Sequence, residues 1–334
     1  MTPASLTIVV DSTSAGLGSV VMRALHNLYY KGPSELLYLD FQSIAYGAPD
    51  ENIWNRFFYQ PCDAEKDRII EMVAAGRYRV RHWRDAGPWL LGYGKEHDRS
   101  QYTRPDFVDR IRALTRAHLR LRPHVADAFD RFHAEHLEGR RVLGVHKRGT
   151  DLLTTSHGAG LYHVINARFL RRRIDRALDQ QNCDWIYLAT DEQVVVDAMV
   201  KSYGRRVIKY PAAVAPAGVL NAVHNLNWNR DPEFKHSLGR DVLIDALALS
   251  RTAHALLMSS NVSLLSLFLR NDFHYEFIDA TFDYSEGFRA RLRGLPYQLV
   301  LEPSKTKYWI RNLFGWVGTP SPAAPATWRG SPTF

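Results

Sequence analysis

The sequence predicts an α/β fold of two domains, each built around a parallel sheet. The chain of 334 residues is long enough for two such cores. Its second half alternates short apolar runs with helical stretches, which is the rhythm of parallel β-α-β units. Its first half opens on an apolar strand, a glycine-containing turn and a helical pattern. We expect a boundary near residue 139, with domains over residues 1–138 and 139–285.

In the first half, strands are expected over residues 6–10 and 35–41, with a helix over 20–30 between them. The turn with Gly16 and Gly18 lacks the third glycine of a dinucleotide fingerprint and the lysine of a phosphate-binding loop. It is expected to let a helix pack closely or to leave room for a substrate. An aromatic-rich section follows, most of it assigned to an irregular core. A helical pattern over 106–136 is expected to break at Pro123.

The second half predicts a doubly wound parallel sheet. Strands are expected over residues 142–145, 185–189, 206–208, 254–258 and 275–278. Helices are expected over residues 164–180, 192–202, 240–250 and 262–269. Residues 212–235 show no period and are interpreted as a long loop. An aromatic segment within 286–318 is expected to pack back across the domains, and 319–334 has the composition of a flexible tail.

The charge balance indicates an anionic ligand or surface. The net charge is +8 and the isoelectric point is near 9.4. No zinc-finger or RNA-binding signature is present, so no nucleic-acid partner is predicted, and a nucleic-acid-binding protein stays a third alternative that rests on charge alone. Cys62 and Cys183 form no CxxC pair, which favours reduced thiols. The apolar run at the N-terminus is only strand-long, so a cytoplasmic protein is expected; peripheral contact with an anionic inner membrane stays open.

The clearest functional signal is the stretch RVLGVHKRGTD over residues 141–151. A buried strand ends there in His146, Lys147 and Arg148. Ligands of open α/β folds bind beyond the carboxyl ends of the strands. Strand alternation places His146 and Arg148 on one side, where a guanidinium can bind a phosphate with two hydrogen bonds. The alternative interpretation is a set of solvated loop charges.

Three further polar sites follow elements of the same predicted sheet. Asp191 follows the strand over 185–189, and Asp245 lies in an apolar helix. A helix opens on a group of small polar residues, Ser259, Ser260, Asn261 and Ser263. Such a helix start exposes N–H groups that suit a phosphate, although taken alone it is more often an ordinary capping motif. Asp191 and Asp245 could likewise be a cap and an ion pair.

Together these sites predict half of a nucleotide-sugar site. Arg148 and residues 260–263 would hold a pyrophosphate, and Asp191 a ribose hydroxyl. His146 and Asp245 would hold a base, because a carboxylate that accepts two N–H bonds matches guanine. No acidic pair with metal-site character is apparent, so no metal is predicted, and Arg148 would neutralise the diphosphate.

Taken in order, the motifs resemble those of the fucosyltransferase superfamily, which includes core α1,6-, rhizobial nodulation and protein O-fucosyltransferases. They are GVHKRGTD over 144–151, ATD over 189–191, LID over 243–245 and SSN over 259–261. The resemblance spans about residues 6–280. It implies the GT-B fold, in which two Rossmann-like domains face a central cleft. The 1–138 domain would be the acceptor side and the 139–285 domain would bind the GDP-sugar.

The resemblance also implies roles for single residues. Arg148 would contact the β-phosphate, His146 and Asp245 would hold guanine, and residues 259–263 would cradle the phosphates. The implied acceptor-side residues are Asp11, Gly16, Gly18 and Trp54. In the α1,6-type enzymes a lysine and a glutamate follow the first motif, whereas this chain has LLTTS over 152–156.

The catalytic base is therefore left open among three residues, Asp151, His157 and Asp11. The leading prediction is an inverting, metal-independent glycosyltransferase without a cofactor. It would move a sugar, fucose first, from a GDP-sugar to a glycan or glycolipid acceptor, with Arg148, Asp151 and His157 as the catalytic residues. The alternative is a non-catalytic protein that binds a sugar nucleotide or an oligosaccharide on the same fold.

Overall fold

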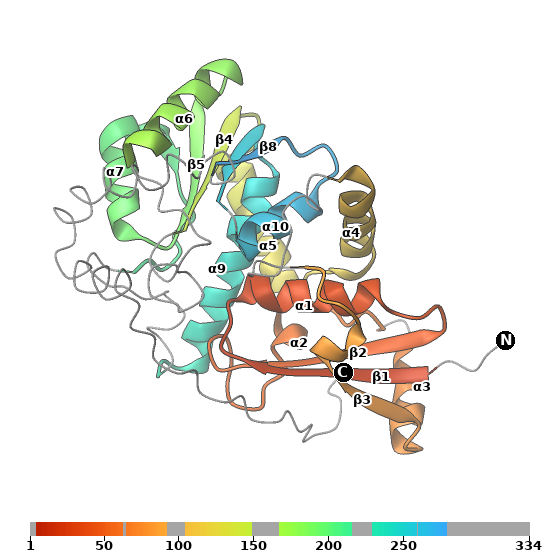
Figure 1. The fold of residues 1–334 in the computed structure, drawn as a ribbon. Helices are drawn as coiled ribbons and strands as arrows, with labels where there is room; N and C mark the ends of the chain where they lie inside the picture. The colour runs from red at the N-terminus through yellow and green to blue at the C-terminus, as the bar shows by residue number, and fades with distance from the viewer. Residues whose placement is uncertain are drawn as a thin grey trace, which may run out of the picture.

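The computed structural model describes residues 5–62, 65–91, 104–148, 167–215, 229–258 and 260–278. The strands are β1 (Ser5–Thr13), β2 (Glu35–Ser43), β3 (Tyr78–His82), β4 (Val142–Lys147), β5 (Trp185–Thr190), β6 (Val207–Ile208), β7 (His254–Leu257) and β8 (Tyr275–Phe277). In the described ranges they form two parallel sheets, ordered β2-β1-β3 and β6-β5-β4-β7-β8 (Figure 1). We call these sheets and their helices the N-terminal and C-terminal lobes. The predicted α/β class is confirmed.

Helices cover both sheets. They are α1 (Leu17–Tyr29), α2 (Ile53–Phe57), α3 (Lys66–Ala74), α4 (Pro105–His118), α5 (Pro123–His136), α6 (Ala167–Gln180), α7 (Gln193–Tyr203), α9 (Pro232–Ser250) and α10 (Asn261–Leu269). Short 3-10 turns, η2 (Trp83–Ala86) and η5 (Gly204–Arg206), follow β3 and α7. The expected break at Pro123 is confirmed, because this proline starts α5 at a position where its missing N–H costs nothing.

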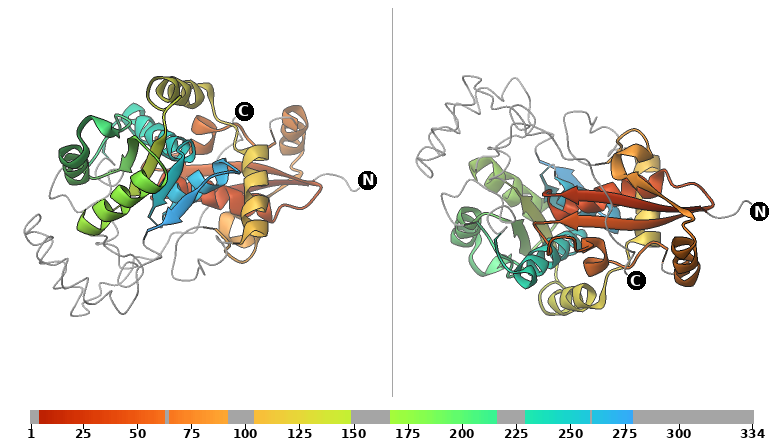
Figure 2. Two further views of the ribbon diagram at one scale, coloured as in Figure 1. Left: turned by 90° about the horizontal axis from the view of Figure 1, so that it is seen from above. Right: turned by 90° about the horizontal axis from the view of Figure 1, so that it is seen from below.

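The five-stranded sheet buries both faces, as parallel sheets do. Leu143 and Val145 of β4 share one core with residues of α6 and α7. On the opposite face, a Cβ at Gly144 would lie 2.7 Å from the Thr252 hydroxyl, just beyond α9. The left-hand view of Figure 2 shows the strands between α6 and α9. His146 is two residues after Gly144 on the same strand, so its side chain points to the same face of the sheet, the face covered by α9.

Helix α9 joins the two lobes. Its C-terminal half packs against β4 and β5, and its N-terminal half contacts α2. The His236 imidazole Nε2 lies 2.8 Å from Glu51 Oε2 of the N-terminal lobe. A Cβ at Gly239 would lie 2.3 Å from the ring of Phe57. One hydrophobic core therefore runs from the first sheet through α1, α9 and α10 to the second.

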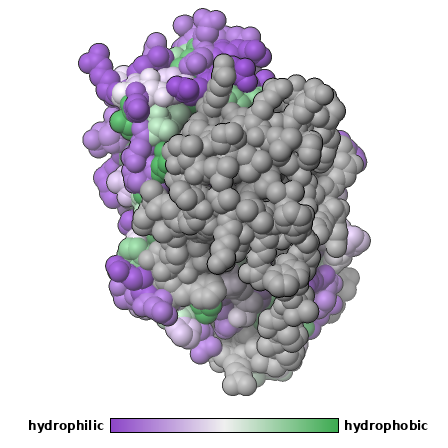
Figure 3. Space-filling view, turned by 60° about the vertical axis from the view of Figure 1, so that its left-hand side comes forward, coloured by the Kyte–Doolittle hydropathy of each residue, from purple (hydrophilic) through white to green (hydrophobic). Residues whose placement is uncertain are grey.

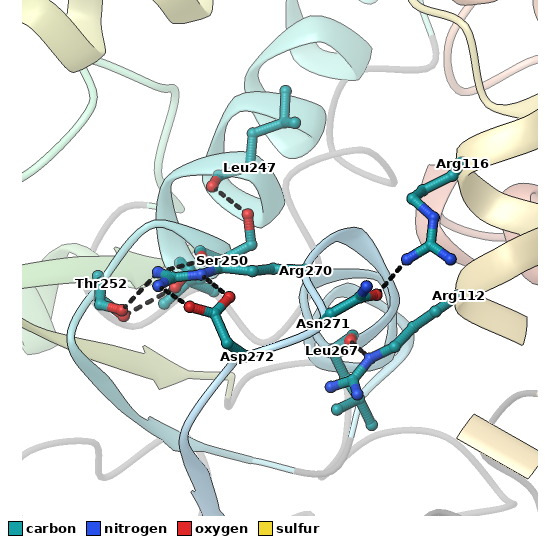
Figure 4. A network of polar contacts seen from close by, with 10 residues as sticks. Arg112, Arg116, Leu247, Ser250, Thr252, Leu267, Arg270, Asn271 and Asp272 are labelled. Carbon is teal, nitrogen blue, oxygen red and sulfur yellow. Dashed lines mark hydrogen bonds and ion pairs between the residues drawn. The ribbon is translucent and has the colours of Figure 1, made fainter. Parts of the chain in front are cut away.

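A polar network closes the opposite side of this interface (Figure 4). Arg112 of α4 donates from Nε to the Leu267 carbonyl at the end of α10, over 3.1 Å. Arg116 donates to the Asn271 side chain. Arg270 is paired with Asp272 and lies near the carbonyl groups that end α9. Cations thus meet the negative ends of two helices.

Two expectations about the elements are wrong. The helix predicted over 240–250 begins at Pro232, where the Asp231 side chain caps the Phe234 N–H at 3.0 Å. The predicted loop over 212–235 therefore ends earlier. The aromatic section also contains α2, α3 and β3, which were not predicted. Residues 286–318 and 319–334 lie outside the described residues, so their predicted roles stay predictions.

The surface over α6 is basic. Arg171, Arg172 and Arg176 are exposed on this helix. Figure 3 shows hydrophilic residues gathered at the top of the molecule. None of the helices in the described part of the chain combines the length and hydrophobicity that crossing a bilayer requires.

Candidate active site

His146 lies near the carboxyl end of β4, and its side chain is buried. Its Nδ1 is 2.7 Å from the Ser263 hydroxyl oxygen and 3.4 Å from that of Ser260. Burial, together with the charges of Arg148 and Lys147, lowers the pKa of this imidazole to about 3. His146 is therefore neutral at physiological pH.

The start of α10 supplies the two serines. Ser260 is the N-cap residue, and its hydroxyl oxygen accepts from the Ser263 N–H at 3.1 Å. The Ser263 hydroxyl donates to the Met258 carbonyl at 2.6 Å. The structure therefore brings His146, Ser260 and Ser263 together, as the sequence predicts. Asn261 is half-buried in the first turn of the helix, and Ser259 lies outside the described residues.

Arg148 and Lys147 separate at the end of β4. Lys147 is buried, and its ammonium lies 3.7 Å from the Glu192 carboxylate at the start of α7. It also donates to the Arg148 carbonyl at 3.0 Å. Arg148 is half-buried and lies close enough to act on the pKa of His146. The predicted alternation therefore places one cation in an ion pair and the other beside the histidine.

Asp245 of α9 is held by Tyr187 of β5. The Tyr187 hydroxyl donates to Asp245 Oδ1 at 2.5 Å. Burial raises the pKa of Asp245 to about 7, and burial also raises the pKa of Asp241, one turn earlier, to about 6. Lys209 acts on the pKa of both carboxyl groups and lowers it. The site thus holds two acidic groups that ionise near neutral pH.

The sheet register connects these two groups. Tyr187 pairs with Gly144, and His146 pairs with Ala189, so Tyr187 and His146 share a face two residues apart on adjacent strands. Strand spacing places their Cα atoms about 8 Å apart. Asp191 follows β5 and raises the pKa of Asp245 through its charge. His146, Arg148, Asp191 and the start of α10 thus lie at the carboxyl ends of β4, β5 and β7, whereas Asp245 lies against Tyr187 in the middle of β5.

The interpretation of Asp191 as a helix cap is wrong, because Glu192 occupies the N-cap position of α7. The Asp191 carbonyl accepts from the Ala215 N–H at 2.7 Å, which ties the segment after β6 to this edge. Sequence reasoning missed Tyr187, Asp241 and Lys209. The strand register could have indicated Tyr187, since it shares the face of His146.

Replacing Asp245 by Asn is expected to change how stability depends on pH. A carboxyl whose folded pKa is raised binds more protons in the folded state, so its contribution falls as pH rises from about 4 through 7. Between pH 5 and 8 the wild type should lose about 1–3 kcal/mol more than Asp245→Asn. Urea unfolding at both pH values measures this. Asp197→Asn, at an exposed position, serves as the control, and equal losses in wild type and Asp245→Asn would contradict the result.

The structure places the predicted acceptor-side residues in two different settings. Asp11 is buried near the end of β1 and forms an ion pair with Arg23. Gly16 is the N-cap of α1, and a Cβ at Gly18 would lie 3.1 Å from Asn261 and Val262. The expected close helix packing at this turn is confirmed, since Gly18 lets the starts of α1 and α10 touch.

Trp54, expected on the acceptor side, has no exposed surface with which to contact a ligand, so that prediction is wrong. Its side chain is fully buried, and its Nε1 donates to the Tyr59 carbonyl at 3.1 Å. Its ring is stacked on Phe58 with centroids 4.5 Å apart. The whole Trp54 ring is buried in the packing of the short helix α2. Asp151 and His157 lie outside the described residues, and their catalytic roles stay predictions.

The described residues contain no group of three or more His, Cys, Asp or Glu side chains placed to hold a metal ion.

No family model matches the sequence, and no curated protein matches it. Among solved structures, the chain is similar to NodZ alpha-1,6-fucosyltransferase co-crystallised with GDP. The identity is 17%, the match covers 78% of this chain and 91% of that one, and the TM-score is 0.45.

Two further structures are similar to this one. Fucosyltransferase NodZ from Bradyrhizobium matches at 18% identity, with 78% and 91% of the chains covered and a TM-score of 0.45. POFUT1 in complex with GDP-fucose matches at 9% identity, with 82% and 98% covered and a TM-score of 0.44.

Proposed function

We propose that the chain is a glycosyltransferase that moves fucose from GDP-fucose to a glycan or glycolipid acceptor. The observation that carries the proposal is the edge of the five-stranded sheet. A neutral buried His146, the serine cap of α10 and the half-buried Arg148 lie at the end of β4. The carboxyl of Asp245, whose pKa is raised, binds Tyr187 on the face of the sheet that Tyr187 and His146 share. This combination offers a cation and helix N–H groups for a diphosphate, and polar side chains for a base.

The phosphate side of the site uses Arg148 and the start of α10. A departing GDP gains negative charge as its bond to the sugar breaks. A guanidinium placed at the strand end stabilises that charge most strongly in the transition state. Lys147 does not share this role, because its ammonium faces Glu192 in a buried pair. Arg148 is thus the cation assigned to the leaving group.

The base side of the site uses Asp245. In its ionised form the carboxylate can accept two N–H bonds, which is the pattern of guanine N1–H and the exocyclic amine. Because its pKa is raised to about 7, GDP binding should favour the ionised form and strengthen as pH rises through this value. Tyr187 steadies the carboxyl from β5 by its hydrogen bond to Oδ1.

The reaction would be a single displacement with inversion at the sugar C1, without a metal in the chemical step. The acceptor hydroxyl would lose its proton to a base that remains among Asp11, Asp151 and His157. Asp11 is paired with Arg23, which occupies one of its oxygen atoms. Asp151 and His157 follow Arg148 closely in sequence and are therefore the first candidates for mutation.

Nucleotide preference provides the first test. We expect GDP and GDP-fucose to raise the melting temperature and UDP, CDP and ADP at the same concentration to leave it unchanged. A ligand at 100 times its Kd stabilises the folded state by about 2.7 kcal/mol. Thermal-shift measurements with Asp245→Asn as the control should show a smaller shift with GDP. Equal shifts with all four nucleotides would contradict a guanine site.

Turnover separates the enzyme from a binding protein. Release of GDP from GDP-fucose, faster with a glycan acceptor than without, supports transfer. Tight GDP-fucose binding with no release under any acceptor would instead support the non-catalytic alternative. A larger increase in melting temperature with GDP-mannose than with GDP-fucose would support the proposed guanine site but indicate mannose, not fucose, as the sugar.

A further inference from the structure

The hydrogen bonds between His146, Ser263 and Met258 permit one arrangement of protons. The Ser263 oxygen lies 2.6 Å from the Met258 carbonyl oxygen, which can only accept. The single hydroxyl proton of Ser263 therefore lies on this bond. Ser263 has no exposed surface, so water does not compete for that proton.

The same Ser263 oxygen is 2.7 Å from His146 Nδ1. Since its own proton is committed to Met258, this oxygen accepts, and Nδ1 donates. The Ser260 hydroxyl is 3.4 Å from both groups, a longer and weaker contact. A neutral imidazole carries one N–H only, so Nε2 keeps its lone pair.

We infer that Ser263 is a positioning residue that holds the proton of His146 on Nδ1 and so makes Nε2 a hydrogen-bond acceptor for the ligand. The role of Nε2 toward the ligand rests on the proposed function, whereas the assignment of the His146 tautomer does not. The ligand atom that meets Nε2 must then be an N–H or O–H donor. For guanine, with Asp245 accepting N1–H and one amine N–H, this selects the second N–H of the exocyclic amine and excludes O6 and N7.

The chain offers a matched control on the same helix. Ser266 is also fully buried, and its hydroxyl donates to the Val262 carbonyl at 3.0 Å. Ser263→Ala and Ser266→Ala each delete one buried hydroxyl from α10. Only the first deletion removes the acceptor from His146.

The tautomer is measured by two-bond ¹H–¹⁵N correlation spectra of the full chain with ¹⁵N-labelled histidine. His146→Asn identifies the His146 signals among those of the 14 histidines. We expect an Nδ1–H tautomer in the wild type and in Ser266→Ala, and an Nε2–H tautomer or a mixture in Ser263→Ala. An Nε2–H tautomer in the wild type, or an unchanged spectrum in Ser263→Ala, would overturn the inference.

Ser263→Cys replaces Ser263→Ala if the latter does not fold, because its thiol is a much weaker acceptor of similar shape. The binding readout is the Kd of GDP, which Ser263→Ala should raise about tenfold. Ser266→Ala should leave the Kd unchanged, and equal effects of the two variants would contradict the link to the ligand. If the wild type binds no GDP, the proposed function fails, while the spectra still decide the tautomer.

Discussion

Arg148→Ala is expected to lower kcat/KM for GDP release from GDP-fucose by about 100-fold or more, the usual cost of removing a principal charge-stabilising group. Arg148 is the half-buried cation beside His146, whereas Lys147 is engaged with Glu192. The loss should fall mainly on kcat, since negative charge develops as GDP departs. Steady-state kinetics over a range of GDP-fucose concentrations measure both parameters.

Two variants serve as controls for Arg148→Ala. Arg141→Ala removes the same charge just before the start of β4, where Arg141 donates to the carbonyl groups of Gln181 and Asn182. It should retain nearly full activity. Arg148→Lys keeps the charge without the planar fork and should recover only part of the activity. Activity of Arg148→Ala close to that of Arg141→Ala would remove Arg148 from the mechanism.

Phe57→Ala is expected to lower the free energy of unfolding by about 3–5 kcal/mol, as for other buried aromatic side chains. Phe57 has no exposed surface, and its ring packs directly over Gly239 of α9. Gly239→Ala alone should destabilise by about 1–3 kcal/mol, because its new methyl group would overlap that ring. Chemical unfolding of each variant measures both values.

The double variant provides the decisive comparison. With the ring removed, Gly239→Ala no longer meets an obstacle and should stabilise the helix by up to about 1 kcal/mol. Gly32→Ala is the control, since a Cβ there would lie 3.8 Å from its nearest neighbour. If Gly239→Ala destabilises the wild type and the Phe57→Ala variant equally, the contact between the Phe57 ring and Gly239 does not determine the stability of the interface.

The sequence predicts elements best where local pattern and final packing agree. Strand β4 is a continuous apolar run and lies in the centre of the second sheet. Strand β3 alternates arginines with apolar residues, and its Arg79 binds Glu35 and Thr7 of neighbouring strands. The first turns of α9 contain a glycine and a buried lysine, Lys235, and pack on the other lobe. Long-range partners of this kind leave no local pattern.

The same distinction holds for the site. His146, Ser260 and Ser263 are predictable because each follows a recognisable strand end or starts a helix. Trp54 is misassigned because composition does not separate an aromatic ring in a core from one in a groove. Tyr187 is missed because its role depends on Asp245, which lies in another element and follows it by 58 positions.

The way α9 belongs to both lobes limits how such proteins can be recombined. A chimera joined at residue 139 would pair the Phe57 of one parent with the α9 of another. The ring and the glycine opposite it would then have to match across the junction. Exchange of donor specificity between relatives should therefore succeed only when the segment around α2 comes from the same parent as the C-terminal lobe. The two halves are thus expected to evolve as one unit.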